Sequence, residues 1–231
     1  MSIGKKIKSF LSNFWYYHKW KVIVVLFFAV VIGVCMTQML TKDEYDVSIM
    51  YAGPDYIEEN DHHSIMGVFE QILPADYDKN GEKKANLIDM LIMSDEQIKE
   101  RDDKAKEEDV LFYYDVKDRN SQLMQISTYI SSGETIICIL DDYVYEMLKE
   151  EGAFCTLESV LGYKPESAHD EYSVTLGDTD LYKSYSVLSK VGENTRLCIV
   201  KMPYTFTSKS QKQSYEWHLE YFKKIVEFKL G

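Results

Sequence analysis

The sequence lacks the short motifs that identify most hydrolases, redox enzymes and zinc proteins. It contains no G-x-S-x-G, no H-E-x-x-H, no C-x-x-C, no phosphate-binding glycine loop and no N-x-[ST] sequon. Serine, histidine and aspartate are present, but nothing in their spacing nominates a catalytic triad. We therefore expect a protein that is not an enzyme.

Cysteine is scarce, with four residues in a chain of 231. Cys35 lies in an apolar run, and the other three, Cys138, Cys155 and Cys198, cannot all pair with one another. The residues around Cys138 and Cys198 are those of buried strands, where a thiol packs as a small hydrophobe. The sequence therefore has no disulfide framework, which fits a bacterial exterior, although a bond between Cys138 and Cys198 stays open.

After the first 21 residues, acidic side chains outnumber basic ones. The whole chain carries a formal charge of −12, and the first 21 residues carry +5, which leaves −17 on residues 41–231. Binding to nucleic acid or to an anionic lipid surface needs clustered lysine and arginine. The composition therefore predicts no nucleic-acid partner for the acidic region.

One long stretch, residues 22–40, contains no charged residue at all. Nineteen helical residues span roughly 28 Å, which is close to the thickness of the hydrocarbon core of a bilayer. Five lysines precede the stretch without any acidic residue, whereas Asp43, Glu44 and Asp46 follow it. This asymmetry predicts a single transmembrane helix with a cytoplasmic N-terminus and an extracytoplasmic C-terminal domain in the cell membrane.

A cleaved signal peptide is the alternative interpretation of this stretch. The run is long for the apolar part of a signal, and no A-x-A-like cleavage site follows it. A lipoprotein signal would end at Cys35, but Val34 occupies the place where a small residue is expected. We therefore expect an uncleaved signal anchor.

Three regions follow from these patterns. We expect residues 1–21 to form a basic cytoplasmic segment. Within it, residues 3–17 form either an amphipathic helix at the membrane interface or a solvated tail. Residues 22–40 form the transmembrane helix. Residues 41–231 form one extracytoplasmic domain, which is long enough for a single core.

The sequence predicts an α/β fold for the acidic domain, with three layers built around a mostly parallel sheet. Uninterrupted apolar runs such as 135–140 are typical of strands that are covered on both faces. We expect strands at 46–51, 86–93, 135–140, 173–176, 184–189 and 196–202. We expect helices at 57–73, 118–131, 142–150, 157–161 and 211–229, with 95–109 as a solvated helix or surface insertion.

Residues 123–162 resemble part of a family. A helix, a small-residue turn ending in Gly133, an apolar strand, an aspartate that opens a helix and an exit Gly152 follow one another as in extracellular solute-binding proteins. With the two earlier strands, the succession is similar to one lobe of their type II fold, the fold of periplasmic binding proteins. The resemblance implies a reduced lobe, and fold likeness alone does not transfer function.

One loop has the spacing of calcium ligands. Asp76, Asp78 and Asn80 precede Gly81 as D-x-D-x-N-G, which places three oxygen ligands around an ion while glycine permits the sharp turn. The twelfth position of an EF-hand loop would need a glutamate, and Leu87 stands there. Calcium is therefore the one cofactor that the sequence suggests, with an ordinary Asx-rich turn as the alternative.

Other polar groups give weaker signals. His62 and His63 lie side by side near acidic residues, but adjacent helical residues point about 100° apart and cannot easily share one ion. His169-Asp170-Glu171 lies in an expected loop. The tyrosine pairs 113–114 and 143/145 have two interpretations, a stacking groove for a sugar or peptide and ordinary packing.

Three classes of function remain. The first is a membrane-anchored binding or assembly module that recognises a membrane or cell-surface protein. The second is a receptor for a sugar, peptide or amino acid that feeds a transporter, which requires a concave pocket. The third is an extracytoplasmic enzyme of unrecognised type, which requires a pocket with perturbed titratable groups.

Overall fold

The computed structural model describes residues 3–40 and 45–229. The chain divides into two compact units, Met1–Glu44 and Tyr45–Gly231. Each unit is considered by itself below.

The first unit is one helix, α1 (Ile3–Leu40). No proline or glycine interrupts residues 5–32, so the basic segment and the apolar run form one continuous helix. Its stretch Phe14–Met36 is long and apolar enough to cross a membrane, and none of it is buried within the structure. A signal sequence would have the same length and composition, so α1 is compatible with both.

The second unit contains a five-stranded sheet in the order β2-β1-β3-β5-β4. Strands β1 (Val47–Gly53), β2 (Ala85–Leu91) and β3 (Ile137–Leu140) are parallel neighbours. Strand β5 (Arg196–Ile199) runs antiparallel between β3 and β4 (Ser173–Thr175). Mixed α/β architecture with a mostly parallel sheet is therefore confirmed.

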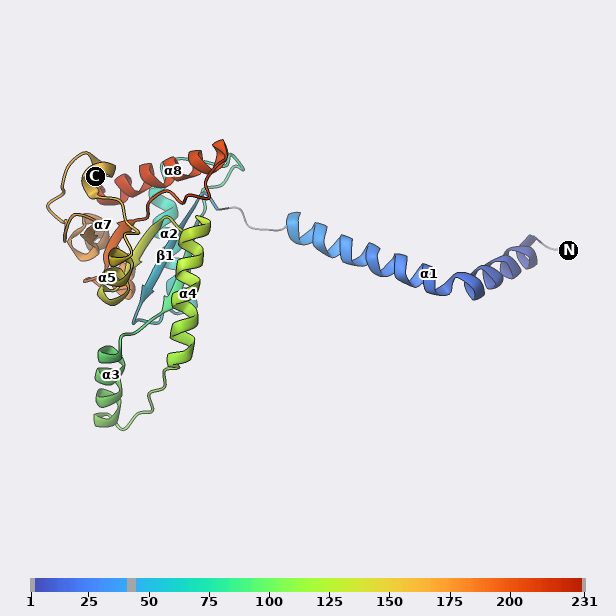
Figure 1. The fold of residues 1–231 in the computed structure, drawn as a ribbon, viewed down its shortest axis with the longest axis horizontal. Coiled ribbons are helices and arrows are strands. Elements are labelled where there is room, and N and C mark those ends of the chain that lie inside the picture. The colour runs from blue at the N-terminus through green and yellow to red at the C-terminus, as the bar shows by residue number, and fades with distance from the viewer. Residues whose placement is uncertain (1–2, 41–44, 230–231) are drawn as a thin grey trace. The chain divides into compact units, whose positions relative to one another are not determined.

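Most of the helices pack on the sheet, whereas α3 (Asp95–Glu107) projects away from it (Figure 1). The helices besides α3 are α2 (Glu59–Ile72), α4 (Val116–Ser132), α5 (Asp142–Glu150), α6 (Leu157–Leu161), α7 (Asp180–Ser184) and α8 (Lys209–Val226), with 3-10 turns η1 (Leu176–Asp178) and η2 (Ser186–Val191). Side-chain oxygens of Ser94, Asp115, Asp141 and Ser208 accept backbone N–H groups at the starts of α3, α4, α5 and α8.

The sheet buries both of its faces, which gives three layers. Along β1, Ile49 and Tyr51 join a core with α2 and α8, whereas Met50 and Ala52 join a second core with α4 and α5. Alternate residues of a strand point to opposite faces. Strands β3 and β5 are buried at every residue for this reason, as the uninterrupted apolar sequence of β3 predicts.

One strand prediction is wrong. Residues 184–189 form the end of α7 and part of η2, although they were expected to be extended. Leu188 and Val191 are both fully buried. Their spacing of three matches the 3-10 turn, which a search for alternating residues cannot detect over so short a segment.

The cysteines of β3 and β5 are free thiols, so the bond that the sequence left open is not formed in this structure. Cys138 and Cys198 are directly opposite in the antiparallel register, and both are fully buried. The Cys198 thiol lies 3.7 Å from the Cys138 carbonyl oxygen and donates to it. Burial raises the pKa of both thiols, which keeps them protonated and unreactive.

Candidate functional site

The first candidate region is the acidic loop before β2, where the sequence predicts calcium ligands. Asp76, Asp78 and Asn80 lie in this loop, and the structure adds Asp46 from the residue before β1. One carboxylate oxygen from each of the three aspartates lies within 4.8 Å of the others. Asp46 is remote in sequence, so no local spacing could have nominated it.

Asp46 holds the acidic loop against the start of the sheet. Its side chain is buried, with 3% of the residue exposed. Oδ1 accepts from the backbone N–H groups of Tyr77 at 2.6 Å and Asp78 at 3.1 Å, and Oδ2 accepts from Lys84 at 3.0 Å. Three backbone donors therefore stabilise this carboxylate without any cation.

The two loop aspartates affect each other's protonation. Asp76 Oδ2 accepts from Gly81 N–H at 2.8 Å, and Asp76 Oδ1 is buried without a partner among the described residues. Desolvation opposes ionisation of Asp76, but the Gly81 N–H and a hydrogen bond with Asp78 outweigh it and lower the pKa of Asp76. Desolvation and Asp76 raise the pKa of Asp78. A shared proton or a bound cation would relieve this repulsion.

Asn80, the third predicted ligand, is engaged within the loop. Its amide nitrogen donates to Asp78 Oδ2 at 2.8 Å, and its amide oxygen accepts from Glu82 N–H at 2.9 Å. These are the contacts of an Asx-type turn. The structure thus brings Asp76 and Asp78 close to Asp46 and keeps Asn80 hydrogen-bonded to Asp78, and calcium binding stays a prediction.

The adjacent histidines have separate environments. His62 Nε2 lies 2.8 Å from the Leu87 carbonyl oxygen and 3.4 Å from Asp89 Oδ1, so His62 joins α2 to β2 and is not merely solvated. His63 is exposed, and its ring lies edge-on to that of His62 at 6.1 Å. Among the described residues, neither belongs to a group of three metal-ligating side chains.

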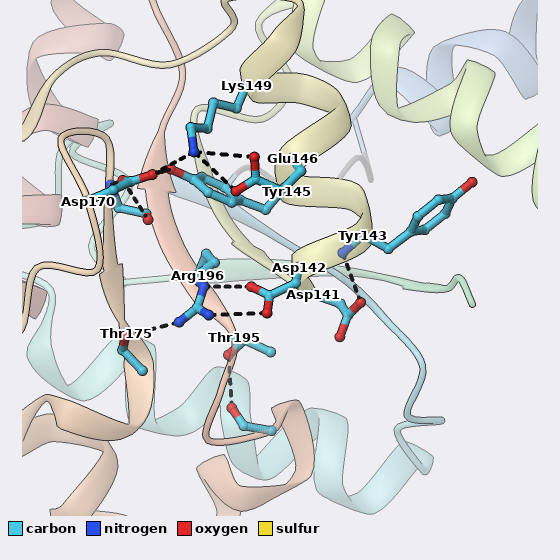
Figure 2. A network of polar contacts seen from close by, with 12 residues as sticks. Asp141, Asp142, Tyr143, Tyr145, Glu146, Lys149, Asp170, Thr175, Thr195 and Arg196 are labelled. Carbon is cyan, nitrogen blue, oxygen red and sulfur yellow. Dashed lines mark hydrogen bonds and ion pairs between the residues drawn. The ribbon is translucent and has the colours of Figure 1, made fainter. Parts of the chain in front are cut away.

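A second acidic group contains Glu146, His169 and Asp170, close enough to share an ion. Lys149 lies among them: its Nζ is 3.1 Å from Glu146 Oε1 and 3.0 Å from Asp170 Oδ2 (Figure 2). The ammonium supplies the positive charge that a metal ion would bring. These side chains therefore form an ion-pair cluster.

Asp170 is the centre of this cluster. It accepts from the Tyr145 hydroxyl at 2.7 Å and from the backbone N–H groups of Tyr172 at 2.8 Å and Ser173 at 3.0 Å. Desolvation opposes ionisation, but these donors and Lys149 hold the pKa of Asp170 well below its usual range. Asp170 therefore fastens the loop before β4 to α5.

Arg196 forms the neighbouring part of the same network. Its guanidinium is largely buried and donates to both carboxylate oxygens of Asp142, at 2.6 and 3.2 Å, and to Thr175 Oγ1 at 3.1 Å (Figure 2). This bidentate pair joins α5 to β4 and β5. Because its polar groups bind one another, we assign the network a structural role.

The tyrosines do not form the shared groove that one interpretation of the sequence suggested. Tyr145 is fully buried and stacks on Phe154 at 5.4 Å, whereas Tyr143 points away from it (Figure 2). Tyr113 is 86% exposed, and the hydroxyl of Tyr114 donates to the Leu91 carbonyl. Packing and anchoring explain Tyr145 and Tyr114, and Tyr113 remains exposed.

The third candidate region is the arm, defined as α3 together with residues 108–115. None of the residues of α3 is buried. Its first turn is held by two polar contacts: Gln97 Nε2 donates to Asp141 Oδ2 at 3.1 Å, and Arg119 donates to Asp95 Oδ1 at 2.7 Å. The rest of α3 projects from the sheet, and a single irregular segment returns to α4 (Figure 1).

A cavity of about 600 Å³ separates α3 from the returning segment. One helical face of α3, the apolar residues 110–112 and Pro54 at the end of β1 line it. The charged residues on the helical side have both signs: Glu100, Arg101 and Lys104 from α3, and Glu108 directly after it. The two sides of the arm are therefore not packed against each other.

The arm also exposes large apolar side chains. Leu111 is fully exposed, Tyr113 is 86% exposed and Val110 is 57% exposed. Met124 on the adjoining α4 is 74% exposed. Exposed apolar side chains that follow one another along a segment, with charged residues on both sides of it, are typical of interaction surfaces. The sequence marked only the pair Tyr113 and Tyr114 here, as a stacking groove or ordinary packing. The exposed apolar residues before them were missed, because a charged helix beside an apolar segment resembles an ordinary surface insertion.

Comparisons with known proteins returned no matching family, no matching curated protein and no matching solved structure.

Proposed function

We propose that the chain is a non-enzymatic binding or assembly module, held at the outer face of a membrane by α1, that binds a membrane or cell-surface protein through its arm. The exposure of Leu111 and Tyr113 on an arm whose helix α3 has no buried residue carries this proposal. A single exposed leucine is ordinary on a protein surface, but several large apolar side chains exposed on one projecting element are typical of a surface that a partner covers.

The membrane part of the proposal is supported by the helix Phe14–Met36 and by the lysines that precede the apolar run. The lysines favour a cytoplasmic N-terminus, which would put the acidic domain outside the cell. A protein held in this way meets partners in the same membrane at a raised effective concentration.

The resemblance to one lobe of a type II solute-binding protein belongs to the same proposal. The succession β1-α2-β2-α3-α4-β3 has the same alternation once α3, which belongs to the arm, is set aside. The described part of the second unit contains one sheet, so a cleft between two sheets is not formed within it. A reduced lobe used for protein binding fits these features better than one used for transport.

A receptor for a small ligand is the second candidate, and the cavity beside Pro54 favours it. Its volume of about 600 Å³ lies in the usual range for ligand sites. A thermal-shift screen of sugars, peptides and amino acids would support this candidate by a rise in the melting temperature. Absence of any rise would remove it.

Photocrosslinking in membranes tests the main proposal. A photoreactive phenylalanine analogue placed at Tyr113 is expected to give one adduct of defined mass. The same analogue at Tyr204, which is 89% exposed but lies outside the arm, is the matched control and should give none. Identical adducts from both positions, or none from Tyr113, would contradict the proposal.

A further inference from the structure

The structure carries a more specific inference about the arm, which rests on the proposed function. We infer that residues 110–114, named here the docking segment, bind an extended polypeptide strand that is apolar at its centre and flanked by lysine or arginine. Neither the sequence motifs nor the fold assigns such a site.

From Leu111 to Tyr114, the exposure pattern of the docking segment is that of an extended chain. Leu111 and Tyr113 are exposed, whereas Phe112 and Tyr114 are half-buried. This alternation has the period of two that places successive side chains of a strand on opposite sides. One side of the segment therefore faces the protein and the other presents apolar groups outward.

The backbone of the docking segment is also free to pair. The Val110 N–H donates to the Ala105 carbonyl, but the N–H and C=O groups of residues 111–114 make no hydrogen bond within the described part of the chain. An extended segment with unpaired polar groups is a template for an added strand. A paired strand lies about 4.8 Å away, and the cavity between α3 and residues 110–112 leaves open space beside the segment.

The ends of the docking segment are held in place. The Tyr114 hydroxyl donates to the Leu91 carbonyl at 3.2 Å and accepts from the Met93 N–H at 3.2 Å, which fastens the segment to the end of β2. Asp109, with φ of 54°, turns the chain at the end of α3. Because the segment is held at its ends before binding, little conformational entropy is lost when a strand adds to it.

The charges around the segment select the partner. Glu107, Glu108 and Asp109 precede the segment and Asp115 follows it, with Lys106 and Lys117 as the nearest basic residues. Residues 95–119 contain ten acidic and six basic side chains, so the surroundings of the segment carry a net charge of −4. Two antiparallel copies of the segment would place these acidic ends beside each other, and residues 41–231 of each copy carry −17. Charge repulsion therefore opposes self-pairing and favours a strand with basic ends.

Peptide binding to the full-length chain in nanodiscs of neutral lipid tests the inference. The probe is a fluorescent peptide, Lys-Lys-Val-Thr-Val-Thr-Val-Lys-Lys, and polarisation reports its binding. Two control peptides change one property each: one is N-methylated at alternate residues, and the other has glutamate in place of lysine. We expect at least a tenfold weaker affinity for each control and a weaker affinity for the probe at high salt.

Protein variants separate strand pairing from general attraction to an acidic surface. Tyr113→Pro removes a backbone donor from the docking segment, and Tyr204→Ser removes an equally exposed tyrosine elsewhere. The first should weaken binding at least tenfold and the second should leave it unchanged. Both variants should have the same melting temperature as the wild type, because neither side chain is packed in the core.

Three results would overturn the inference. They are no binding of the lysine peptide, equal binding of the N-methylated peptide or of the Tyr113→Pro variant, and self-association of the chain through position 113 in sedimentation. A crosslink from position 113 to another protein without peptide binding would overturn strand addition while leaving the proposed function intact.

Discussion

At the scale of single residues, Asp46 and the two loop aspartates, Asp76 and Asp78, show how far the sequence alone could identify the site. The spacing of Asp76 and Asp78 was sufficient to nominate them, because both lie in one turn. Asp46 required the fold, since it meets the loop only when β1 and β2 pair in parallel. Long-range neighbours of this kind are absent from any local pattern.

The calcium hypothesis predicts a thermal shift. At a hundredfold excess of calcium over its dissociation constant, binding would stabilise the fold by about 2.7 kcal/mol and raise the melting temperature by roughly 5–10 °C. Asp76→Asn should abolish the shift, whereas Asp102→Asn on exposed α3 should preserve it. Differential scanning calorimetry checks this, and no shift or heat at millimolar calcium would remove the hypothesis.

His218 on α8 predicts a dependence of stability on pH. It is buried, Nε2 accepts from the Ser48 N–H at 3.3 Å, and Nδ1 lies 2.7 Å from the Ser214 carbonyl that it donates to. Desolvation lowers the pKa of His218 below 6.5. The unfolded chain therefore binds the proton first, and stability is complete above pH 6.5 and falls as the pH decreases below it.

The size of the His218 effect is set by this single proton. Below pH 6.5, its contribution to the free energy of unfolding should fall by about 1.4 kcal/mol per pH unit until its folded pKa is reached. Urea unfolding of the wild type and of His218→Gln at pH 7.5 and 5.5 measures it. A variant with the same pH slope as the wild type would show that His218 does not titrate in this way.

At the scale of elements, the sequence predicted most strands and helices but not their order in the sheet. Apolar runs identified β1, β2 and β3, and apolar spacing together with glycine and proline identified α2, α4, α5 and α8. The antiparallel insertion of β5 between β3 and β4 depends on tertiary pairing, which periodicity does not contain. The arm was recognised as a solvated helix, but the exposed segment after it was not.

We predict that most of the arm can be removed without unfolding the domain. Replacing residues 99–112 by an eight-residue Gly-Ser linker loses the exposed Arg101–Asp55 ion pair of 2.7 Å and no buried side chain. Such a pair contributes about 0–1 kcal/mol, so the free energy of unfolding should change by no more than about 1 kcal/mol. Urea denaturation measures it, and loss of cooperative unfolding would contradict the prediction.

Arg119→Ala is the matched comparison for that deletion. Arg119 is largely buried and donates to the Met93 carbonyl at 3.0 Å as well as to Asp95. Removing it leaves a buried acceptor unpaired, and we expect a loss of about 1–3 kcal/mol. The single substitution should therefore destabilise the domain more than removal of most of the arm.

At the scale of the whole molecule, the account joins an apolar helix to an acidic domain whose exposed arm would meet a partner. The charge asymmetry across the apolar run predicts the direction of insertion, and the acidic composition predicts that nucleic acid is not a partner. Neither the partner nor the arm follows from these properties. Both depend on which surfaces the fold leaves uncovered.

The intact mass of the protein extracted from membranes tests most directly whether α1 anchors the domain. The account predicts the full chain of 27.0 kDa without a lipid. It also predicts that the protein stays in the membrane after washing with carbonate and leaves it only in detergent. Loss of the first 34 residues with a lipid on Cys35, or a soluble form that lacks the apolar run, would contradict it.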